Sequence, residues 1–163
     1  MAGVMRRFFS LIALALAAAL APSAQAERTI VIRVESHVRV SFPHDLPPKG
    51  RENKGDYLKY QSLLLNTEPR FGKRKGIPVG WDKGTLTYLS PTIARFTGAA
   101  HFPGQGSIKY KGVMKSLPNG DSSIKIIDGG GKFLGARGVL IIGPGNTKAL
   151  NTFRFTLPSG SVA

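Results

Sequence analysis

The stretch RTIVIRVESHVRVSF, from Arg28 to Phe42, alternates between apolar and polar side chains along its length. Successive side chains of a β-strand point to opposite faces, so this period of two predicts a half-buried strand. The polar face is expected to meet water, with Arg33, Glu35 and His37 on it. The apolar face is predicted to comprise Ile30, Ile32, Val34, Val38, Val40 and Phe42.

The remainder of the chain repeats this pattern with almost no helical periodicity. Strand-like runs alternate with Gly, Pro, Asn and Asp, and turns such as Pro103-Gly104-Gln105-Gly106 carry residues suited to tight reversals. Further strands are predicted over residues 55–66, 77–89, 92–102, 107–116, 122–127, 136–142 and 149–157. Consecutive short strands with tight connections predict an all-β fold, an eight-stranded antiparallel up-and-down β-barrel. Such a barrel holds packed side chains or one small ligand.

The N-terminal residues have the features of an export signal. Arg6 and Arg7 precede an apolar run from Phe8 to Leu20, and Ala24-Gln25-Ala26 supplies a small-x-small cleavage pattern. We therefore expect a cleaved signal peptide over residues 1–26 and a single β-barrel domain over residues 27–163. The predicted location is secreted or periplasmic.

Composition limits the chemistry and the partners. The chain has no cysteine, which excludes disulfides, thiolate metal sites and a cysteine nucleophile. His37, His44 and His101 show no metal-ligand spacing, so neither a metal nor a cofactor is expected. The net charge of +14 would attract polyanions, but the basic residues are dispersed and are not interleaved with aromatics. Nucleic acid is therefore not expected as a partner, while a weak contact with an anionic envelope surface stays open.

Glycine-marked motifs carry a resemblance to a known superfamily. The segment Ile126 to Gly138, IIDGGGKFLGARG, resembles the glycine-rich segment of dirigent proteins between the sixth and seventh strands. Gly106-Ser107-Ile108 and Gly55-Asp56 are similar to motifs at the starts of two other strands of that family. The spaced glycines of the turn after the second strand are Gly72, Gly76 and Gly80. On these motifs, in the same order, the chain resembles the dirigent / allene oxide cyclase barrel superfamily.

The resemblance implies an eight-stranded barrel with a largely apolar central cavity, assembled as a homotrimer. Some members of the superfamily steer radical coupling, and others isomerise or cyclise small molecules. They do so by holding the substrate in one conformation. Asp128 and Gly130 depart from the usual motif, and the cysteines of some members are missing. These departures leave the fold expectation unchanged and the particular chemistry open.

Four residues are predicted to carry a catalytic site, if there is one. Asp56 opens the second strand, and alternation places it on one face with Tyr60, so both are candidate acid, base or hydrogen-bonding groups. Arg95 and Arg137 each interrupt or adjoin an apolar strand and complete the set. A turn aspartate that bonds its own backbone is the alternative explanation for Asp56. The polar loop over residues 43–54 is expected to be an entry lid.

The function expected from these observations is the binding of a small apolar or amphipathic molecule in the cavity, with cyclisation, isomerisation or steering of its coupling. The enzyme assignment stays open, with an isomerase or cyclase activity without a cofactor favoured. The alternatives are a non-catalytic binding or envelope protein and a basic polyanion-binding surface protein. Partnered ionisable groups inside the barrel would favour catalysis, and a cavity without them would favour simple binding.

Overall fold

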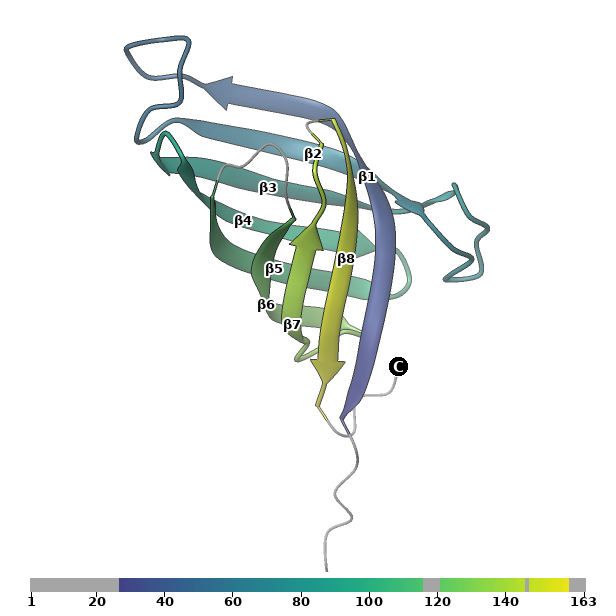
Figure 1. Cartoon of the computed structure of the whole chain (residues 1–163). Helices are drawn as coiled ribbons and strands as arrows, with labels where there is room; N and C mark the ends of the chain where they lie inside the picture. Colours follow the sequence, from purple (N-terminus) through teal and green to yellow (C-terminus); the bar gives the residue numbers. More distant parts are fainter. Residues whose placement is uncertain (1–26, 116–120, 146, 159–163) are drawn as a thin grey trace, which may run out of the picture.

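The protein is a closed antiparallel barrel of eight strands, each paired with its neighbours in sequence (Figure 1). The computed structural model describes residues 27–115, 121–145 and 147–158, so the predicted signal peptide lies outside the described residues. The strands are β1 (Arg28–His44), β2 (Tyr57–Asn66), β3 (Pro78–Ser90), β4 (Ile93–Phe102), β5 (Gly106–Lys115), β6 (Ser122–Gly131), β7 (Arg137–Ile142) and β8 (Lys148–Leu157). The predicted all-β barrel is therefore confirmed. The described residues include no helix long and apolar enough to cross a membrane.

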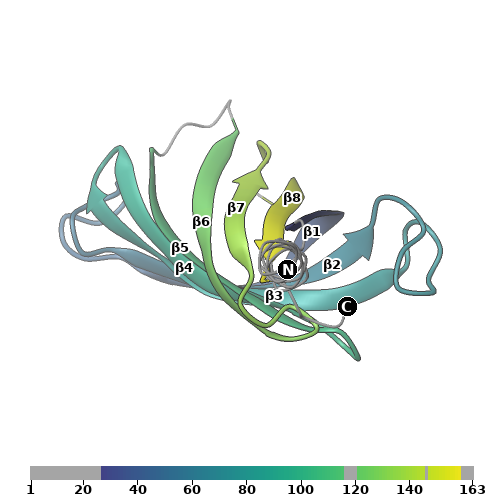
Figure 2. The same ribbon diagram turned by 90° about the horizontal axis from the view of Figure 1, so that it is seen from below.

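Strand β1 closes the barrel because it is long enough to serve two neighbours. Its first part, from Arg28 to His37, pairs with β8, and its second part, from Val34 to His44, pairs with β2. Figure 1 shows β1 running beside β8 and then bending over toward β2. Figure 2 shows the strands following one another around the barrel, with β3 to β5 on one side and β6 to β8 on the other.

The predicted apolar face of the first strand is wrong in its last part. The pairing register between β1 and β2 shifts between Val38 and Val40, and such a bulge exchanges the two faces of the strand beyond it. Ile32 and Val34 are fully buried as predicted, whereas Val40 is 41% and Phe42 is 65% exposed. Beyond the bulge, Ser41 is the residue opposite Tyr60.

One end of the barrel is filled by aromatic side chains. Phe102, Phe133, Phe153 and Phe155 are all at most 5% exposed, and their rings meet edge-on at centroid distances of 5.7–5.9 Å. Phe71, from the β2–β3 loop, packs on Phe102 at 5.6 Å. The β6–β7 corner lies at this end, and Phe133 anchors it in apolar packing. We call this the closed end.

Backbone crowding explains the glycines of the β6–β7 corner. A Cβ at Gly129 would lie 2.0 Å from the carbonyl oxygen of Phe133, and Gly131 has a φ of 64°. Only glycine accommodates both the close approach and the left-handed conformation without strain. The sequence motif therefore marks the place where the chain reverses tightly under Phe133.

The opposite end of the barrel is less tightly filled. It carries the β1–β2 loop and the β3–β4 turn, and the interior side chains near it are only partly buried. These residues are Leu58, Leu86, Met114 and Ile142, from β2, β3, β5 and β7. We call this the open end, because it is the end at which interior side chains remain accessible.

Candidate active site

Three polar side chains meet inside the barrel between the closed and the open end. Asp82 of β3 is 2% exposed, and its carboxylate accepts a short hydrogen bond from the hydroxyl of Tyr110 of β5. The hydroxyl oxygens of Tyr110 and Tyr60 lie 2.7 Å apart, and the Tyr60 hydroxyl lies 3.5 Å from the second carboxylate oxygen of Asp82. We call Tyr60, Asp82 and Tyr110 the hydroxyl cluster.

The rings of the two tyrosines are held by Phe96. Its ring is nearly parallel to the ring of Tyr60, at a centroid distance of 5.4 Å, and to the ring of Tyr110, at 5.6 Å. Stacking fixes the direction of each phenol, so the two hydroxyls converge on Asp82. Tyr110 is fully buried, while Tyr60 is only partly buried. Tyr60 is therefore the more accessible of the two tyrosines.

A pair of glycines makes the space in which the two hydroxyls lie. Gly84 of β3 and Gly98 of β4 face each other in register. A Cβ at Gly84 would lie 2.8 Å from the Tyr60 hydroxyl, and one at Gly98 would lie 2.4 Å from the Tyr110 hydroxyl. Real Cβ atoms do not approach so closely, so the tyrosines occupy this position because both residues lack side chains.

Replacement of Gly98 by alanine is therefore expected to displace the Tyr110 hydroxyl from Asp82. Overpacking of this kind costs about 1–3 kcal/mol of unfolding free energy, which urea denaturation would measure. Gly130→Ala is the control for an added methyl group, because Gly130 is outside the left-handed region and the atom nearest to a Cβ there is the Ser107 Oγ at 3.3 Å. An NMR resonance of the Tyr110 hydroxyl proton that is unchanged in Gly98→Ala would contradict the placement of this hydroxyl against Gly98.

Burial determines the protonation of the cluster. Burial raises the pKa of Asp82 from 3.8 to about 7, and hydrogen bonds from Tyr110 and Tyr60 only partly offset it. Burial also raises the pKa of both tyrosines well above the usual value, and the nearby Asp82 charge raises them further. Both phenols therefore stay protonated, and Asp82 is the member that titrates near neutral pH.

The protonation of Asp82 decides whether the cluster can offer a hydrogen bond. With Asp82 ionised, Tyr110 donates to the carboxylate and Tyr60 donates to Tyr110, so both phenol protons are used within the cluster. With Asp82 protonated, its carboxylic acid donates a hydrogen bond to the Tyr110 oxygen and Tyr110 donates to Tyr60, which leaves the Tyr60 hydroxyl proton without an acceptor in the cluster. The neutral cluster therefore presents one free donor at Tyr60, and the ionised cluster presents none.

The structure brings only some of the predicted site residues together. Tyr60 lies in the cluster, and Asp56 lies on the same side of β2, nearer the open end. Arg95 is exposed on the outer face of β4. Arg137 is also exposed, where it donates to the carbonyl oxygens of Ile127 and Ala136. Neither arginine reaches the barrel interior, so the structure gives no support to their predicted catalytic role.

Asp56 organises the β1–β2 loop. Its carboxylate accepts hydrogen bonds from the backbone N–H of Leu46 at 2.7 Å and of Asn53 at 2.6 Å. The side chain of Asn53 donates in turn to the carbonyl oxygens of Leu46 and Pro48. These contacts agree with the alternative explanation of Asp56 as a loop aspartate that satisfies nearby backbone groups.

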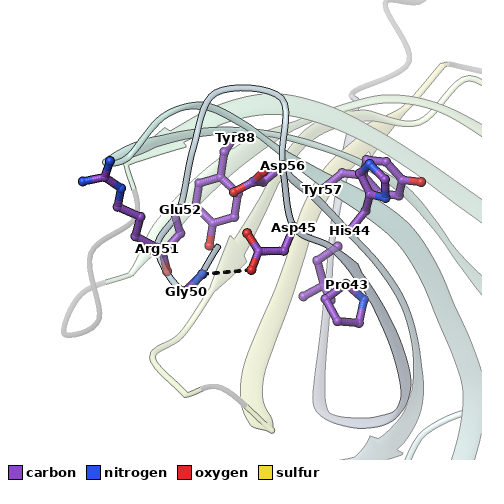
Figure 3. A pocket seen from close by; sticks show the side chains of 10 residues that line it. Pro43, His44, Asp45, Gly50, Arg51, Glu52, Asp56, Tyr57 and Tyr88 are labelled. Carbon is purple, nitrogen blue, oxygen red and sulfur yellow. Dashed lines mark hydrogen bonds between the residues drawn. The ribbon is translucent and has the colours of Figure 1, made fainter. Parts of the chain in front are cut away.

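The same loop forms one wall of a pocket at the open end, with a volume of about 300 Å³ (Figure 3). Leu58 and Tyr88 contribute its inner side, and the ring of His44 stacks on Tyr57 at 4.7 Å beside it. Figure 3 also shows Asp45 and Glu52 at the loop side of the pocket. Leu58 precedes Tyr60 by one inward position on β2, so the pocket lies on the open-end side of the hydroxyl cluster.

Asp82 and Tyr110 were missed as site residues in the sequence. Period-two alternation places Asp82 on the same face of the third strand as Gly80, Gly84 and Leu86. An acidic residue at an inward position between two glycines is the sequence feature that could have identified Asp82 as a site residue. Tyr110 similarly shares a face with Ile108 and Gly112. Among the described residues, no group of three or more His, Cys, Asp and Glu is arranged to hold a metal ion.

The barrel is similar in fold to several solved structures. A pyocyanin demethylase matches with a TM-score of 0.64 and 15% identity, over 77% of this chain and 99% of that one. A pterocarpan synthase dirigent protein matches with a TM-score of 0.61 and 13% identity, over 84% and 93%. A Diels–Alderase from Streptomyces koyangensis matches with a TM-score of 0.61 and 16% identity, over 100% and 86%. The chain has the dirigent-like barrel fold.

The resemblance inferred from the glycine motifs is thereby confirmed at the level of fold. No protein-family model and no curated protein matches the sequence at a significant level. At 13–16% identity, the matched structures establish the architecture of this dirigent-like barrel and leave its activity to be argued from its own residues.

Proposed function

We propose that this dirigent-like barrel is an exported protein that binds a small, largely apolar carbonyl compound and promotes its cyclisation or isomerisation. The observation that carries the proposal is the buried Asp82 joined to two tyrosine hydroxyls, one of them belonging to the partly buried Tyr60. Partnered ionisable groups inside a barrel favour catalysis over simple binding. Export is supported by the signal-like residues 1–26.

The binding step follows from the geometry of the open end. A molecule entering through the 300 Å³ pocket would pass Leu58 and reach Tyr60, with Leu86 and Met114 as further apolar walls. Its carbonyl oxygen would accept the free Tyr60 proton. The apolar walls would exclude water and hold a flexible chain in one folded conformation, which lowers the entropic part of the barrier to ring closure.

The chemical step needs negative charge to develop on that oxygen. Donors already oriented in a buried site stabilise such charge strongly, and a tyrosine hydroxyl with a neutral carboxylic acid forms the oxyanion hole of ketosteroid isomerase. Here Tyr60 would donate to the oxygen, and Asp82 would support it through Tyr110. In the ring closure a new σ bond forms at the expense of a π bond conjugated with the carbonyl, and negative charge gathers on the oxygen in the transition state and recedes as the ring closes. No atom is gained or lost, so the product is an isomer of the substrate.

Replacing Tyr60 with phenylalanine tests the proposal. We expect wild-type protein to bind 1-tetralone, a rigid aromatic ketone, at pH 5.5, and Tyr60→Phe to bind it about ten-fold more weakly, since one hydrogen bond to a buried oxygen is lost. Isothermal titration calorimetry measures both affinities. The control is Thr97→Val, which removes a hydroxyl from the exposed outer face of β4, away from both the pocket and the cluster. Equal affinities for the two variants would contradict the proposal.

A further inference from the structure

A further polar side chain on the inward face has a buried oxygen atom that has no partner among the described residues. Asn151 of β8 is 4% exposed and lies on the same face as the fully buried Phe153. Its Oδ1 atom is buried and accepts no hydrogen bond from any group in the described part of the chain. The residues directly opposite it, Val34 of β1 and Ile142 of β7, are both apolar.

An unsatisfied buried carbonyl is unfavourable, so its presence calls for an explanation. A leucine at this position would have a similar volume and would pack against Val34 and Ile142 without that penalty. Asn151 holds no loop or turn in the described residues through this oxygen. The unpaired Oδ1 atom therefore destabilises the free protein, and this free-energy penalty is removed only when a bound group donates a hydrogen bond to Oδ1.

Asn66 offers a contrast within the same chain. It is also a buried asparagine whose Oδ1 has no partner among the described residues. However, its amide nitrogen donates to the carbonyl oxygens of Arg70 at 3.0 Å and of Lys73 at 3.2 Å, which fixes the basic β2–β3 loop. Asn66 therefore has a structural reason to be polar.

The position of Asn151 in the barrel indicates which groups can contact its side chain. It lies near the start of β8, at the open end, beside the partly buried Ile142. Ser36, which is 7% exposed, lies on the inward face of β1, where it is opposite Ala149, two residues from Asn151. The inward faces of β1 and β8 thus carry two buried polar side chains, Ser36 and Asn151, among apolar neighbours.

We propose that Asn151 is a second ligand anchor, whose carboxamide oxygen accepts a hydrogen bond from a hydroxyl or N–H group of the bound molecule. The inference rests on the proposed function for the location of the ligand and adds its chemical class. The ligand would combine an acceptor oxygen, held by Tyr60, with a donor group elsewhere on an apolar frame. Hydroxylated aromatic ketones have this combination.

A site with a buried acceptor discriminates strongly against analogues that lack the donor, because the acceptor is then left unpaired. The test compares 5-, 6- and 7-hydroxy-1-tetralone with their methoxy counterparts at pH 5.5 by titration calorimetry. Wild type should prefer at least one hydroxy isomer by about ten-fold. Asn151→Leu should reduce that preference to about two-fold or less, while Tyr60→Phe should weaken hydroxy and methoxy ligands alike.

A stability measurement tests the inference without any ligand. Asn151→Leu should raise the melting temperature, because it removes an unpaired carbonyl, whereas the matched Asn66→Leu should lower it by releasing the β2–β3 loop. A melting temperature lowered in both variants would overturn the inference, as would a hydroxyl preference that survives in Asn151→Leu. Failure of the proposed function would appear separately, as ligand binding that does not depend on Tyr60.

Discussion

Asp82→Asn is expected to gain stability relative to wild type as the pH rises from 4 to 8. Burial raises the pKa of Asp82 from 3.8 to about 7, so between these values the folded protein holds a proton that the unfolded chain releases. Folding is then coupled to proton uptake, and the wild-type stability contributed by neutral Asp82 is complete below pH 4 and is lost as the pH rises through 7. The loss amounts to roughly 4 kcal/mol.

Asparagine cannot ionise, and its amide donates permanently to Tyr110, so the variant lacks this loss. Urea denaturation of both proteins at several pH values gives the difference in unfolding free energy, in which the titration of all other groups cancels. Asp128→Asn is a control, because Asp128 lies on the outer surface, where it is 3.6 Å from Lys109. A difference that stays constant from pH 4 to 8 would show that Asp82 is ionised throughout.

Phe102→Ala is expected to cost about 3–5 kcal/mol of unfolding free energy. The Phe102 side chain is fully buried at the closed end, in contact with the rings of Phe71, Phe133 and Phe153. Its removal leaves a cavity whose surrounding rings lie on three separate segments of the chain, and the rigid barrel prevents them from collapsing to fill it. Urea or thermal denaturation at pH 5.5 measures the loss.

Phe42→Ala is the matched control for this substitution. Phe42 is 65% exposed beyond the β1 bulge, so the same truncation should change the stability by less than about 1 kcal/mol. Equal losses for the two variants would mean that the aromatic cluster does not hold the closed end together. They would also mean that Phe42 is buried, as the uninterrupted alternation of the first strand had predicted.

The strands could be predicted because alternation and turn residues are local signals. The sequence predicts that Val34 faces inward and that Gly104 lies in a tight turn. Val34 is fully buried, and Gly104 has a positive φ. The bulge after Val38 could not be predicted, because it depends on the pairing of β1 with β2 rather than on the residues of β1 itself. Register is a property of two segments, and one inserted residue inverts a face.

The candidate site was only partly predictable for a related reason. Tyr60 was identified because it shares a face with other interior residues of one strand. Asp82 and Tyr110 are separated by 28 positions in the sequence and meet only when β3, β4 and β5 pair in register, across the Gly84–Gly98 pair. The spacing of these residues along the sequence does not predict this contact. Arg95 and Arg137, which adjoin apolar strands in the same way as Tyr60 does, lie on the outer surface of the barrel.

The central claim is that a neutral Asp82 leaves Tyr60 free to donate to a ligand. Its most direct test is the affinity for 1-tetralone, measured by titration calorimetry from pH 5 to 9 for wild type and Asp82→Asn. We predict that wild-type affinity falls by about ten-fold as the pH rises through 7, while Asp82→Asn binds equally well throughout. A wild-type affinity that does not change with pH, or one that falls in parallel in Asp82→Asn, would contradict the account.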